Sequence, residues 1–313
     1  MKIYEEFTIT NCQSLKKPTI YFWLKSIGLS ESYISQLRRQ KDSIVLNDNN
    51  ANLKTQISDG DKLNIANNPT EKTNFYNTNF SNLSIVYEDE DYLIVNKPHN
   101  LACIPTKSHY NDNLGAQVCS YMQKENQGFV LRIINRLDKE TAGLVVVAKN
   151  LFAYKNLSNL QKEYFALCHG NLSSTQMTIN KPILTRNING INIMKREISE
   201  EGKQAITHVE LIKNFDKYCL VKFHLETGRT HQIRVHMSHI NHPLIGDTIY
   251  SDKVNDSQIQ PTPEHTMLLL KSISFKHFRT NQIISIETTF PEEWKLIFLL
   301  RPIPHTLSQV VQN

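Results

Sequence analysis

The chain has 313 residues, 40% of them hydrophobic, so it is long enough to bury a large core and to form two domains. Its formal net charge of +5 is compatible with binding nucleic acid but does not require it. The five cysteines are scattered and include no CxxC pair, as expected for reduced core thiols in a cytoplasmic protein. The chain has no apolar signal segment and no apolar run of membrane-spanning length, so we expect neither a secreted nor a membrane protein.

Residues 14–66 have the pattern of a small separate module. Apolar residues at helical spacing predict a helix over 20–27, and Ser30 or Ser32 can cap a second helix. Two short strands, bounded by turn-forming residues, are predicted at Ser43–Leu46 and Asp61–Ile65. The pattern alone therefore indicates a small α/β module.

The second predicted helix ends in a basic cluster, Arg38, Arg39 and Lys41. Such a cluster can neutralise RNA phosphates without contacting bases. The alternative is a solvated helix end whose positive charges complement the helix dipole. We favour the phosphate-binding interpretation.

The rest of the chain predicts strands and helices in mixed order. The predicted elements are a hairpin over Ser84–Lys97, a helix over Asn113–Gln123, strands over Leu144–Ala148 and Tyr164–Gly170, a helix over Leu151–Glu163, and antiparallel strands over Ala205–Lys213 and Tyr218–Leu225. The polar and basic segment 180–201 fits either a substrate-facing loop insertion or an ordinary exposed hairpin.

Two longer stretches combine reactive side chains with apolar runs. In LRIINRLDKETAGLVVVAKN, residues 131–150, a dense polar turn comes directly before a strand expected to be buried on both faces. A polar loop at the end of a buried strand is a usual place for reactive groups. The second stretch, GRTHQIRVHMSHINHPLIGDTIY at 228–250, has the same mixture of Arg, His and Asp between apolar residues.

These stretches resemble the signatures of the RluA-type pseudouridine synthases. NRLDKETAGLVVVAK is similar to the catalytic motif of that family, HRLDxxTSGLLLLAK, and GRTHQIRVH followed by HPLIGDTIY is similar to its second signature. YEDEDYLIVNKP resembles the first conserved stretch of the family. The chain departs from the family pattern at His99, Asn100 and Ile104, and at Asn135, where His is common.

The resemblance implies an α+β protein with the pseudouridine synthase fold, in which helices flank a mixed, largely antiparallel central sheet. The helix–helix–sheet module ahead of it resembles the S4-type RNA-binding domain. We expect an S4-like α/β domain at residues 1–70, a linker rich in Asn, Thr and Ser at 71–83, the catalytic domain at 84–305 and a C-terminal tail at 306–313. A monomer is expected.

Pseudouridine formation breaks the bond between ribose C1′ and uracil N1 and rejoins the ring through C5. The reaction needs no redox change and no energy input, so the resemblance implies no cofactor. The ten glycines form no GxG pair, and the chain has no GxxxxGK[ST] loop. Neither a dinucleotide fingerprint nor a P-loop is therefore present in the sequence.

The resemblance assigns the reacting carboxylate to Asp138, as a covalent nucleophile or a base. A carboxylate in a desolvated pocket needs a cationic partner to stay ionised. Arg234 is the expected partner, because a guanidinium can bind a carboxylate through two parallel hydrogen bonds. Tyr164 matches the tyrosine of the family's KxYxA stretch, which would stack on the uracil and take part in proton transfer.

Two arginines are expected to contact the RNA near the reaction. A uridine inside folded RNA must leave its stack before it can react. Arg136 matches the family position whose side chain fills the resulting gap, and a simple phosphate contact is the alternative. Arg229, in the second signature, is also expected to bind RNA.

The second signature holds four histidines that could suggest zinc: His231, His236, His239 and His242. In a helix, however, they fall on different faces, no cysteine lies among them, and two arginines add positive charge. We expect packing, capping or RNA contacts and no metal. Asp247, after a glycine, is expected to form a turn.

The leading hypothesis is an RNA pseudouridine synthase, with large-subunit 23S ribosomal RNA favoured over transfer RNA as substrate. An RNA-binding or ribosome-assembly factor without catalysis is the first alternative, and the presence of Asp138, Tyr164 and Arg234 together argues against it. The second alternative is a metal-dependent hydrolase that uses the histidines, which predicts stoichiometric zinc in the purified protein.

Overall fold

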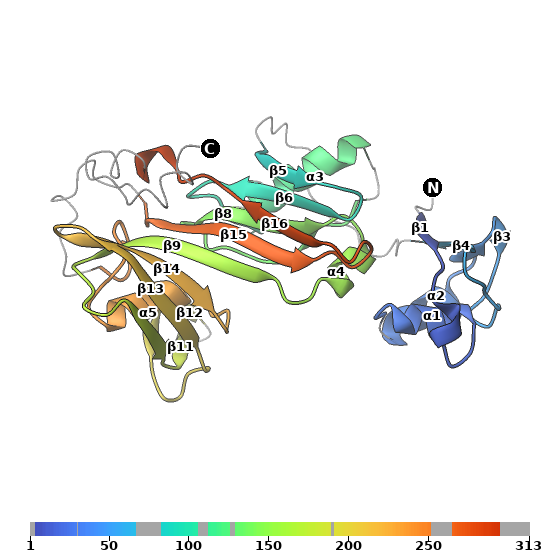
Figure 1. Ribbon diagram of the computed structural model, residues 1–313, viewed down its shortest axis with the longest axis horizontal. Coiled ribbons are helices and arrows are strands. Elements are labelled where there is room, and N and C mark those ends of the chain that lie inside the picture. The colour runs from blue at the N-terminus through green and yellow to red at the C-terminus, as the bar shows by residue number, and fades with distance from the viewer. Residues whose placement is uncertain are drawn as a thin grey trace.

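The computed structural model describes residues 4–29, 31–66, 83–105, 112–125, 129–188, 191–251 and 265–294. A small N-terminal unit precedes a larger unit that is built on one long sheet (Figure 1). None of the helices in these ranges is long and apolar enough to cross a membrane. Most of the expected linker and all of the expected C-terminal tail lie outside the described residues.

The N-terminal unit, residues 4–66, is an antiparallel four-stranded sheet in the order β1-β4-β2-β3 with two helices. Its elements are β1 (Tyr4–Thr8), a 3-10 turn (Cys12–Ser14), α1 (Ile20–Ser26), α2 (Glu31–Arg39), β2 (Ile44–Leu46), β3 (Asn49–Asn50) and β4 (Lys62–Ala66). The predicted helices and strands are confirmed. Two strands, β1 and the short β3, were not predicted. Strand β1 pairs with β4 so that Phe7 lies opposite Leu63 in a common core.

The larger unit contains a ten-stranded sheet in the order β10-β13-β14-β9-β15-β8-β6-β5, with β16 paired to β15 and β7 to β8. Its strands are β5 (Ile85–Glu88), β6 (Tyr92–Lys97), β7 (Arg132–Ile133), β8 (Ala142–Ala148), β9 (Gln161–His169), β10 (Gln176–Asn180), β13 (Ile206–Asn214), β14 (Tyr218–Leu225), β15 (Leu268–Lys276) and β16 (Ile283–Glu287). Only the pairing of β15 with β8 is parallel among the described strands. The mixed, largely antiparallel sheet is confirmed.

Strand β8 is the centre of this sheet. All its residues are buried, because it lies between β6 and β15 and both its faces are covered by apolar side chains. Gly143 has a φ of +118°, and a Cβ at this position would lie 2.2 Å from the carbonyl oxygen of Leu270 on β15. A glycine is therefore required for the close approach of the two strands just after the polar turn.

The larger unit also contains the helices α3 (Leu114–Glu125), α4 (Leu151–Asn156) and α5 (Gln232–His239). The helix predicted over 151–163 is wrong in its second half, because α4 ends at Asn156 and β9 begins at Gln161. From Gln161 onward the backbone pairs with β15, and this pairing overrides the local helical pattern.

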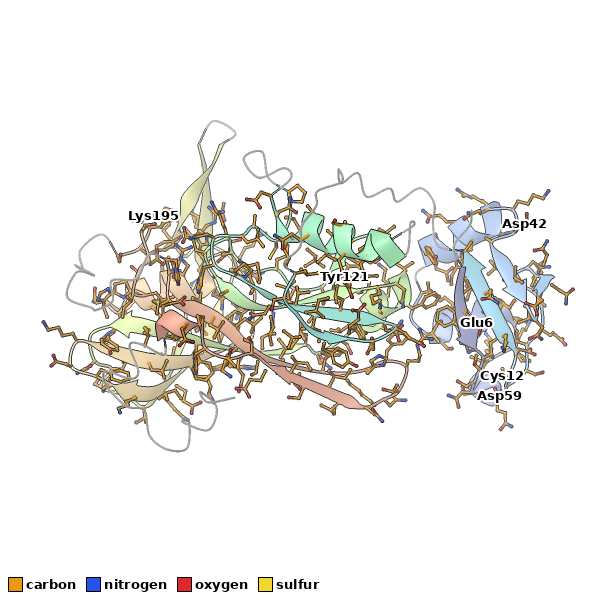
Figure 2. The ribbon with its side chains drawn as sticks, turned by 90° about the horizontal axis from the view of Figure 1, so that it is seen from above. Glu6, Cys12, Asp42, Asp59, Tyr121 and Lys195 are labelled. Carbon is orange, nitrogen blue, oxygen red and sulfur yellow. The ribbon has the colours of Figure 1, made fainter. Side chains whose placement is uncertain are left out.

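In the polar segment 180–201, β11 (Ile183–Ile188) and β12 (Ile191–Ile198) form a hairpin. A hairpin was one of the two alternatives expected for this segment. Lys195 lies on it, far from the N-terminal unit, which carries Glu6 and Asp42 (Figure 2). All five cysteines of the chain are free and buried, which confirms that they are core thiols.

The two units contact each other through α4. Leu151 and Phe152 of this helix belong to the same apolar cluster as the core of the N-terminal unit. The ring centroids of Phe7 and Phe152 lie 4.0 Å apart, and the Arg279 guanidinium lies 5.2 Å from the Phe7 ring. The N-terminal unit therefore packs on the larger unit through buried apolar surface.

Candidate active site

A cavity of about 630 Å³ lies where the turn between β7 and β8 meets the start of α5. It has the size of an ordinary small-ligand pocket. Five predicted site residues from three separate segments line it: Arg136, Asp138, Tyr164, Arg229 and Arg234. The fold thus brings together the residues that the two signatures and the KxYxA stretch singled out.

Asp138 is half-buried in the turn before β8, and its carbonyl accepts a hydrogen bond from the Thr141 amide at 3.1 Å. Asn135 fixes the start of this turn. Its Oδ1 accepts from the Val146 amide at 2.8 Å, and its Nδ2 donates to the Leu144 carbonyl at 3.1 Å. The departure from the family pattern at Asn135 is therefore a buried brace that ties the turn to β8.

Lys97, at the end of β6, is fully buried beneath the same turn. Its Nζ donates to the carbonyls of Pro98, Leu101 and Lys139 at 2.9, 2.8 and 3.0 Å. Burial lowers the pKa of Lys97 to about 8, against the opposing negative charge of Asp138. Lys97 thus joins the loop after β6 to the turn that carries Asp138. The sequence reasoning gave it no role, although a lysine at the end of an apolar strand was a usable signal.

Arg234, on α5, is buried and does not form the expected salt bridge with Asp138. Its Nε and Nη2 donate to both carboxylate oxygens of Asp247 at 2.7 and 2.8 Å, and Nη2 also lies 3.0 Å from Glu140. Asp138 and Arg234 are both described, and no ion pair joins them. The guanidinium is paired with the fully buried Asp247 carboxylate instead, which would be costly to leave unpaired in the interior.

The charge of Arg234 nevertheless acts on the site. Burial alone would lower the pKa of Arg234, but the hydrogen bonds and charge of Asp247 outweigh it, with further contributions from Glu140 and Asp138, and raise the pKa. The guanidinium is therefore a permanent cation at the cavity wall. In a site of low dielectric it favours the ionised form of a neighbouring carboxylate even without contact.

Asp247 forms a turn, as predicted, and also neutralises Arg234. Its Oδ1 accepts from the amides of Ile249 and Tyr250 at 3.0 and 3.1 Å, while both oxygens bind the guanidinium. The second role was not predicted from the sequence. The available sequence signal was Asp247 itself, which follows Gly246 and lies 13 positions after Arg234.

Tyr164, on β9, is buried with its side chain at the cavity. Burial raises the pKa of Tyr164 above its usual range, and the charges of Asp138 and Cys103 act in the same direction. The phenol is therefore protonated at neutral pH. In the cavity that Asp138 also lines, it offers a flat face for a base and a hydroxyl proton.

Three of the four histidines of the second signature bind protein groups in different places. The contacts are His231 with the Tyr250 hydroxyl, His236 with the Thr207 hydroxyl and the Lys181 carbonyl, and His242 with the His169 carbonyl. Burial lowers the pKa of both His231 and His236. These imidazoles therefore brace α5 and the loops around it.

Among the described residues, one group of side chains lies close enough to share a metal ion: His99, His265 and Glu293. The two imidazole rings stack at 3.7 Å with an angle of 28° between their planes. Nε2 of His265 lies 3.0 Å from the Glu293 carboxylate, and Nε2 of His99 lies 3.9 Å from the same oxygen. The three side chains form a compact polar cluster. Burial lowers the pKa of His99 to about 4.

The remaining predicted RNA-binding residues lie at different distances from the cavity. Arg229 is exposed at its rim and donates from Nε to the Gln204 carbonyl at 2.9 Å. Arg38 and Arg39 form the exposed last turn of α2, followed by exposed Lys41, and none of these three lines the cavity.

Comparison with known proteins places this site in a family. The family model of RNA pseudouridylate synthase matches residues 91–239. The chain is 36% identical over 224 residues to the uncharacterized RNA pseudouridine synthase YlyB of Bacillus subtilis, covering 67% of this chain and 70% of that protein. This chain belongs to the RluA-type RNA pseudouridine synthases. It is also 32% identical over 238 residues to the ribosomal large subunit pseudouridine synthase D of Blochmanniella floridana, covering 73% and 72% of the two chains.

Solved structures agree with this assignment. Human RNA pseudouridylate synthase domain containing 1 superimposes with a TM-score of 0.52 at 26% identity, covering 66% of this chain and 83% of that chain. Human RNA pseudouridylate synthase domain containing 4 gives a TM-score of 0.54 at 20% identity, with coverages of 69% and 92%, and supports the fold alone. This pseudouridine synthase is therefore an isomerase with the expected fold.

Proposed function

We propose that this synthase isomerises specific uridines in structured RNA, with Asp138 as the reacting carboxylate and large-subunit ribosomal RNA as the substrate. The observation that carries the proposal is the single cavity in which Asp138, Tyr164 and Arg234 meet. The three residues come from separate segments, and together they supply a carboxylate, a protonated phenol and a permanent cation. No cofactor takes part in the proposed reaction.

In this proposal Asp138 acts on the ribose of the extruded uridine, as a nucleophile at C1′ or as a base at C2′. Either role requires an ionised carboxylate. Arg234 favours ionisation through its field, while Lys97 and Asn135 hold the turn that carries Asp138. Arg234 therefore acts as an electrostatic and positioning residue, not as a direct partner of Asp138.

Tyr164 would stack on the uracil and take part in proton transfer, either at the sugar or in removing the hydrogen that C5 loses when it bonds to C1′. Its raised pKa keeps the phenol protonated, so its hydroxyl can donate a hydrogen bond to the substrate. The exposed Arg136, two residues before Asp138, would enter the gap that the extruded uridine leaves in the RNA stack.

The choice of RNA rests on relatives and on the N-terminal unit. One relative, which matches this chain over 72% of its own length, is named ribosomal large subunit pseudouridine synthase D. We propose that residues 1–70 are an S4-like RNA-binding domain whose exposed Arg38, Arg39 and Lys41 contact phosphates, ahead of a catalytic domain at 84–305. A monomeric, cytoplasmic enzyme is part of this proposal.

Tritium release tests the proposal. In vitro transcripts of 23S ribosomal RNA and of transfer RNA, each carrying 5-tritiated uridine, are incubated with the protein without metal or nucleotide. We expect release from the ribosomal transcript, since attachment of C5 to the sugar displaces its hydrogen. Release from transfer RNA alone would overturn the substrate choice, and no release from either RNA despite binding would favour the assembly factor.

A further inference from the structure

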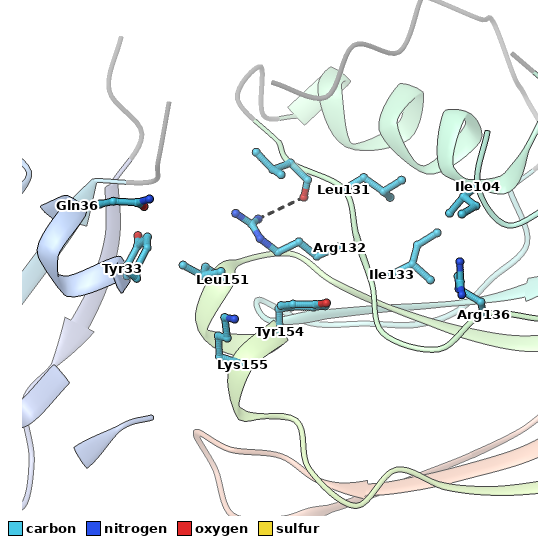
Figure 3. Close-up of a pocket in the computed structure, with 11 residues that line it drawn as sticks. Tyr33, Gln36, Ile104, Leu131, Arg132, Ile133, Arg136, Leu151, Tyr154 and Lys155 are labelled. Carbon is cyan, nitrogen blue, oxygen red and sulfur yellow. Dashed lines mark hydrogen bonds between the residues drawn. The ribbon is translucent and has the colours of Figure 1, made fainter. Parts of the chain in front are cut away.

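A second cavity, of about 550 Å³, lies between α2 of the N-terminal unit and α4 of the catalytic unit (Figure 3). We call it the interdomain groove. Ile104 and Arg136 line both this groove and the active-site cavity. The two spaces therefore meet at Arg136, two residues from the reacting carboxylate.

The side chains of the groove suit a polyanion that carries flat rings. Arg136 and Lys155 are exposed cations, and Tyr154 presents an exposed ring between them (Figure 3). None of the described residues that line the groove is a carboxylate. A third cation, Arg132, is buried, and its Nη1 donates to the Val130 carbonyl at 3.3 Å, so it supports the wall.

The wall formed by α2 is held in place by the contact between the two units. Tyr33 and Gln36 of α2 face the groove in Figure 3. On the same side of the unit, Leu151 and Phe152 of α4 are buried in the N-terminal core. The groove is therefore part of a packed interface, and its two walls come from the catalytic and the N-terminal unit.

We propose that the interdomain groove binds single-stranded RNA next to the extruded uridine, with one base stacked on Tyr154 and a phosphate paired with Lys155, while Arg136, where the groove meets the active site, fills the gap in the RNA stack. This inference rests on the proposed function, because its occupant is the substrate strand. Aromatic side chains stack on any base, and lysine and arginine neutralise phosphates, so this recognition is independent of sequence. Nζ of Lys155 lies 5.8 Å from the centroid of the Tyr154 ring, close enough for both to bind one nucleotide.

The proposal also gives the N-terminal unit a specific task. A strand that leaves the active site past Arg136 runs along α4 toward α2, where Gln36 is exposed. The N-terminal unit then forms one wall of the path that the substrate strand follows. The basic end of α2 lies beyond this wall and does not line the groove.

Direct binding tests the groove with the full-length protein. The probe is a fluorescein-labelled 12-nucleotide oligouridine, and its Kd is measured by fluorescence anisotropy over a range of salt concentrations. Loss of one base–aromatic stack costs about 1–3 kcal/mol, so Tyr154→Ala should raise Kd roughly tenfold, and Tyr154→Phe should retain tight binding. Lys155→Gln should lower the slope of log K against log salt by about 0.7, the value for one phosphate contact on a single strand. Lys217→Gln, in the exposed turn between β13 and β14, is the matched control and should bind like the wild type.

An abasic oligomer of the same length separates stacking from charge. It keeps the phosphates but lacks the bases, so Tyr154→Ala should bind it as the wild type does, whereas Lys155→Gln should still bind it more weakly. The groove assignment is overturned if Tyr154→Ala and Lys155→Gln both match Lys217→Gln with oligouridine. It is also overturned if Tyr154→Ala weakens binding of the abasic oligomer as much as that of oligouridine.

Failure of the groove and failure of the proposed function give different results. If the wild type releases tritium but the Tyr154 and Lys155 variants leave both KM and Kd unchanged, the enzyme stands and the groove fails. If the wild type releases no tritium while these variants weaken oligouridine binding as expected, the groove binds RNA and the proposed reaction fails.

Discussion

The buried pair of Arg234 and Asp247 gives a sharp stability prediction. The Arg234 side chain is 2% exposed and that of Asp247 is 0% exposed, whereas Glu140, the second partner of Arg234, is 27% exposed. Asp247 makes two hydrogen bonds to the guanidinium, whereas Glu140 makes one contact at 3.0 Å. The two carboxylates should therefore contribute very differently, although both are salt-bridged to the same arginine.

Asp247→Asn leaves the guanidinium without its buried counter-charge, and removing one partner of a buried pair costs about 3–5 kcal/mol. Asparagine retains an oxygen that can accept from the amides of Ile249 and Tyr250, and Glu140 remains nearby, so we expect a loss of about 3 kcal/mol, at the lower end of this range. Glu140→Gln removes a partly solvated charge and should cost about 1 kcal/mol or less.

Urea unfolding measures this difference, because Trp23 lies in the N-terminal core and Trp294 in a core of the catalytic unit. In a Trp23→Phe background, the fluorescence of Trp294 reports on the catalytic unit alone. The reasoning is refuted if Asp247→Asn and Glu140→Gln lower the free energy of unfolding equally, or if Asp247→Asn costs less than about 1 kcal/mol.

Three further predictions concern the supports of the catalytic turn and the histidine pair. Gly143→Ala should destabilise the enzyme severely, because the new Cβ would lie 2.2 Å from a backbone oxygen. Gly60 also has a positive φ, but a Cβ there would meet no atom within 4 Å, so Gly60→Ala should lower the free energy of unfolding by only about 1 kcal/mol, as measured by thermal unfolding. Lys97→Met should abolish tritium release and lower the free energy of unfolding by about 3 kcal/mol, because three buried carbonyls lose their donor; activity at the wild-type level would contradict this. The pKa of His99 is about 4 in the folded state, below the usual 6.5, so the unfolded chain binds more protons between these values and stability falls as pH drops from 6.5 to 4. The unfolding free energy of His99→Gln should therefore fall by up to about 3 kcal/mol less than that of the wild type between pH 7 and pH 4. An unchanged pH dependence would contradict the lowered pKa of His99.

The sequence predicted those features that depend on one local segment. The apolar run 144–148 was sufficient to predict the buried strand β8, because its composition already matches a position covered on both faces. The signatures also predicted which residues share the cavity, among them Asp138, Tyr164 and Arg234, whose catalytic roles remain proposals. Family resemblance supplied this information, and single-residue patterns did not.

Features that depend on contacts between distant segments were missed or predicted wrongly. The partner of Arg234 is Asp247, because the loop after α5 folds back under the helix, and no local pattern encodes that return. Lys97 acquires its role only when three carbonyls from two loops meet around it. The helix predicted over 151–163 is too long because β9 pairs with β14 and β15, and this non-local pairing outweighs local periodicity.

The central proposal is that the reaction depends on the carboxylate of Asp138, and one comparison tests it most directly. The unfolding free energy and the RNA affinity of wild type and Asp138→Asn are first measured to establish that the two proteins agree in both. Tritium release from the 23S ribosomal transcript is then measured in single-turnover reactions. We expect rapid release by the wild type and none above background by Asp138→Asn, with both proteins bound to the RNA. Release by Asp138→Asn at the wild-type rate would contradict the assignment of Asp138 as the reacting group.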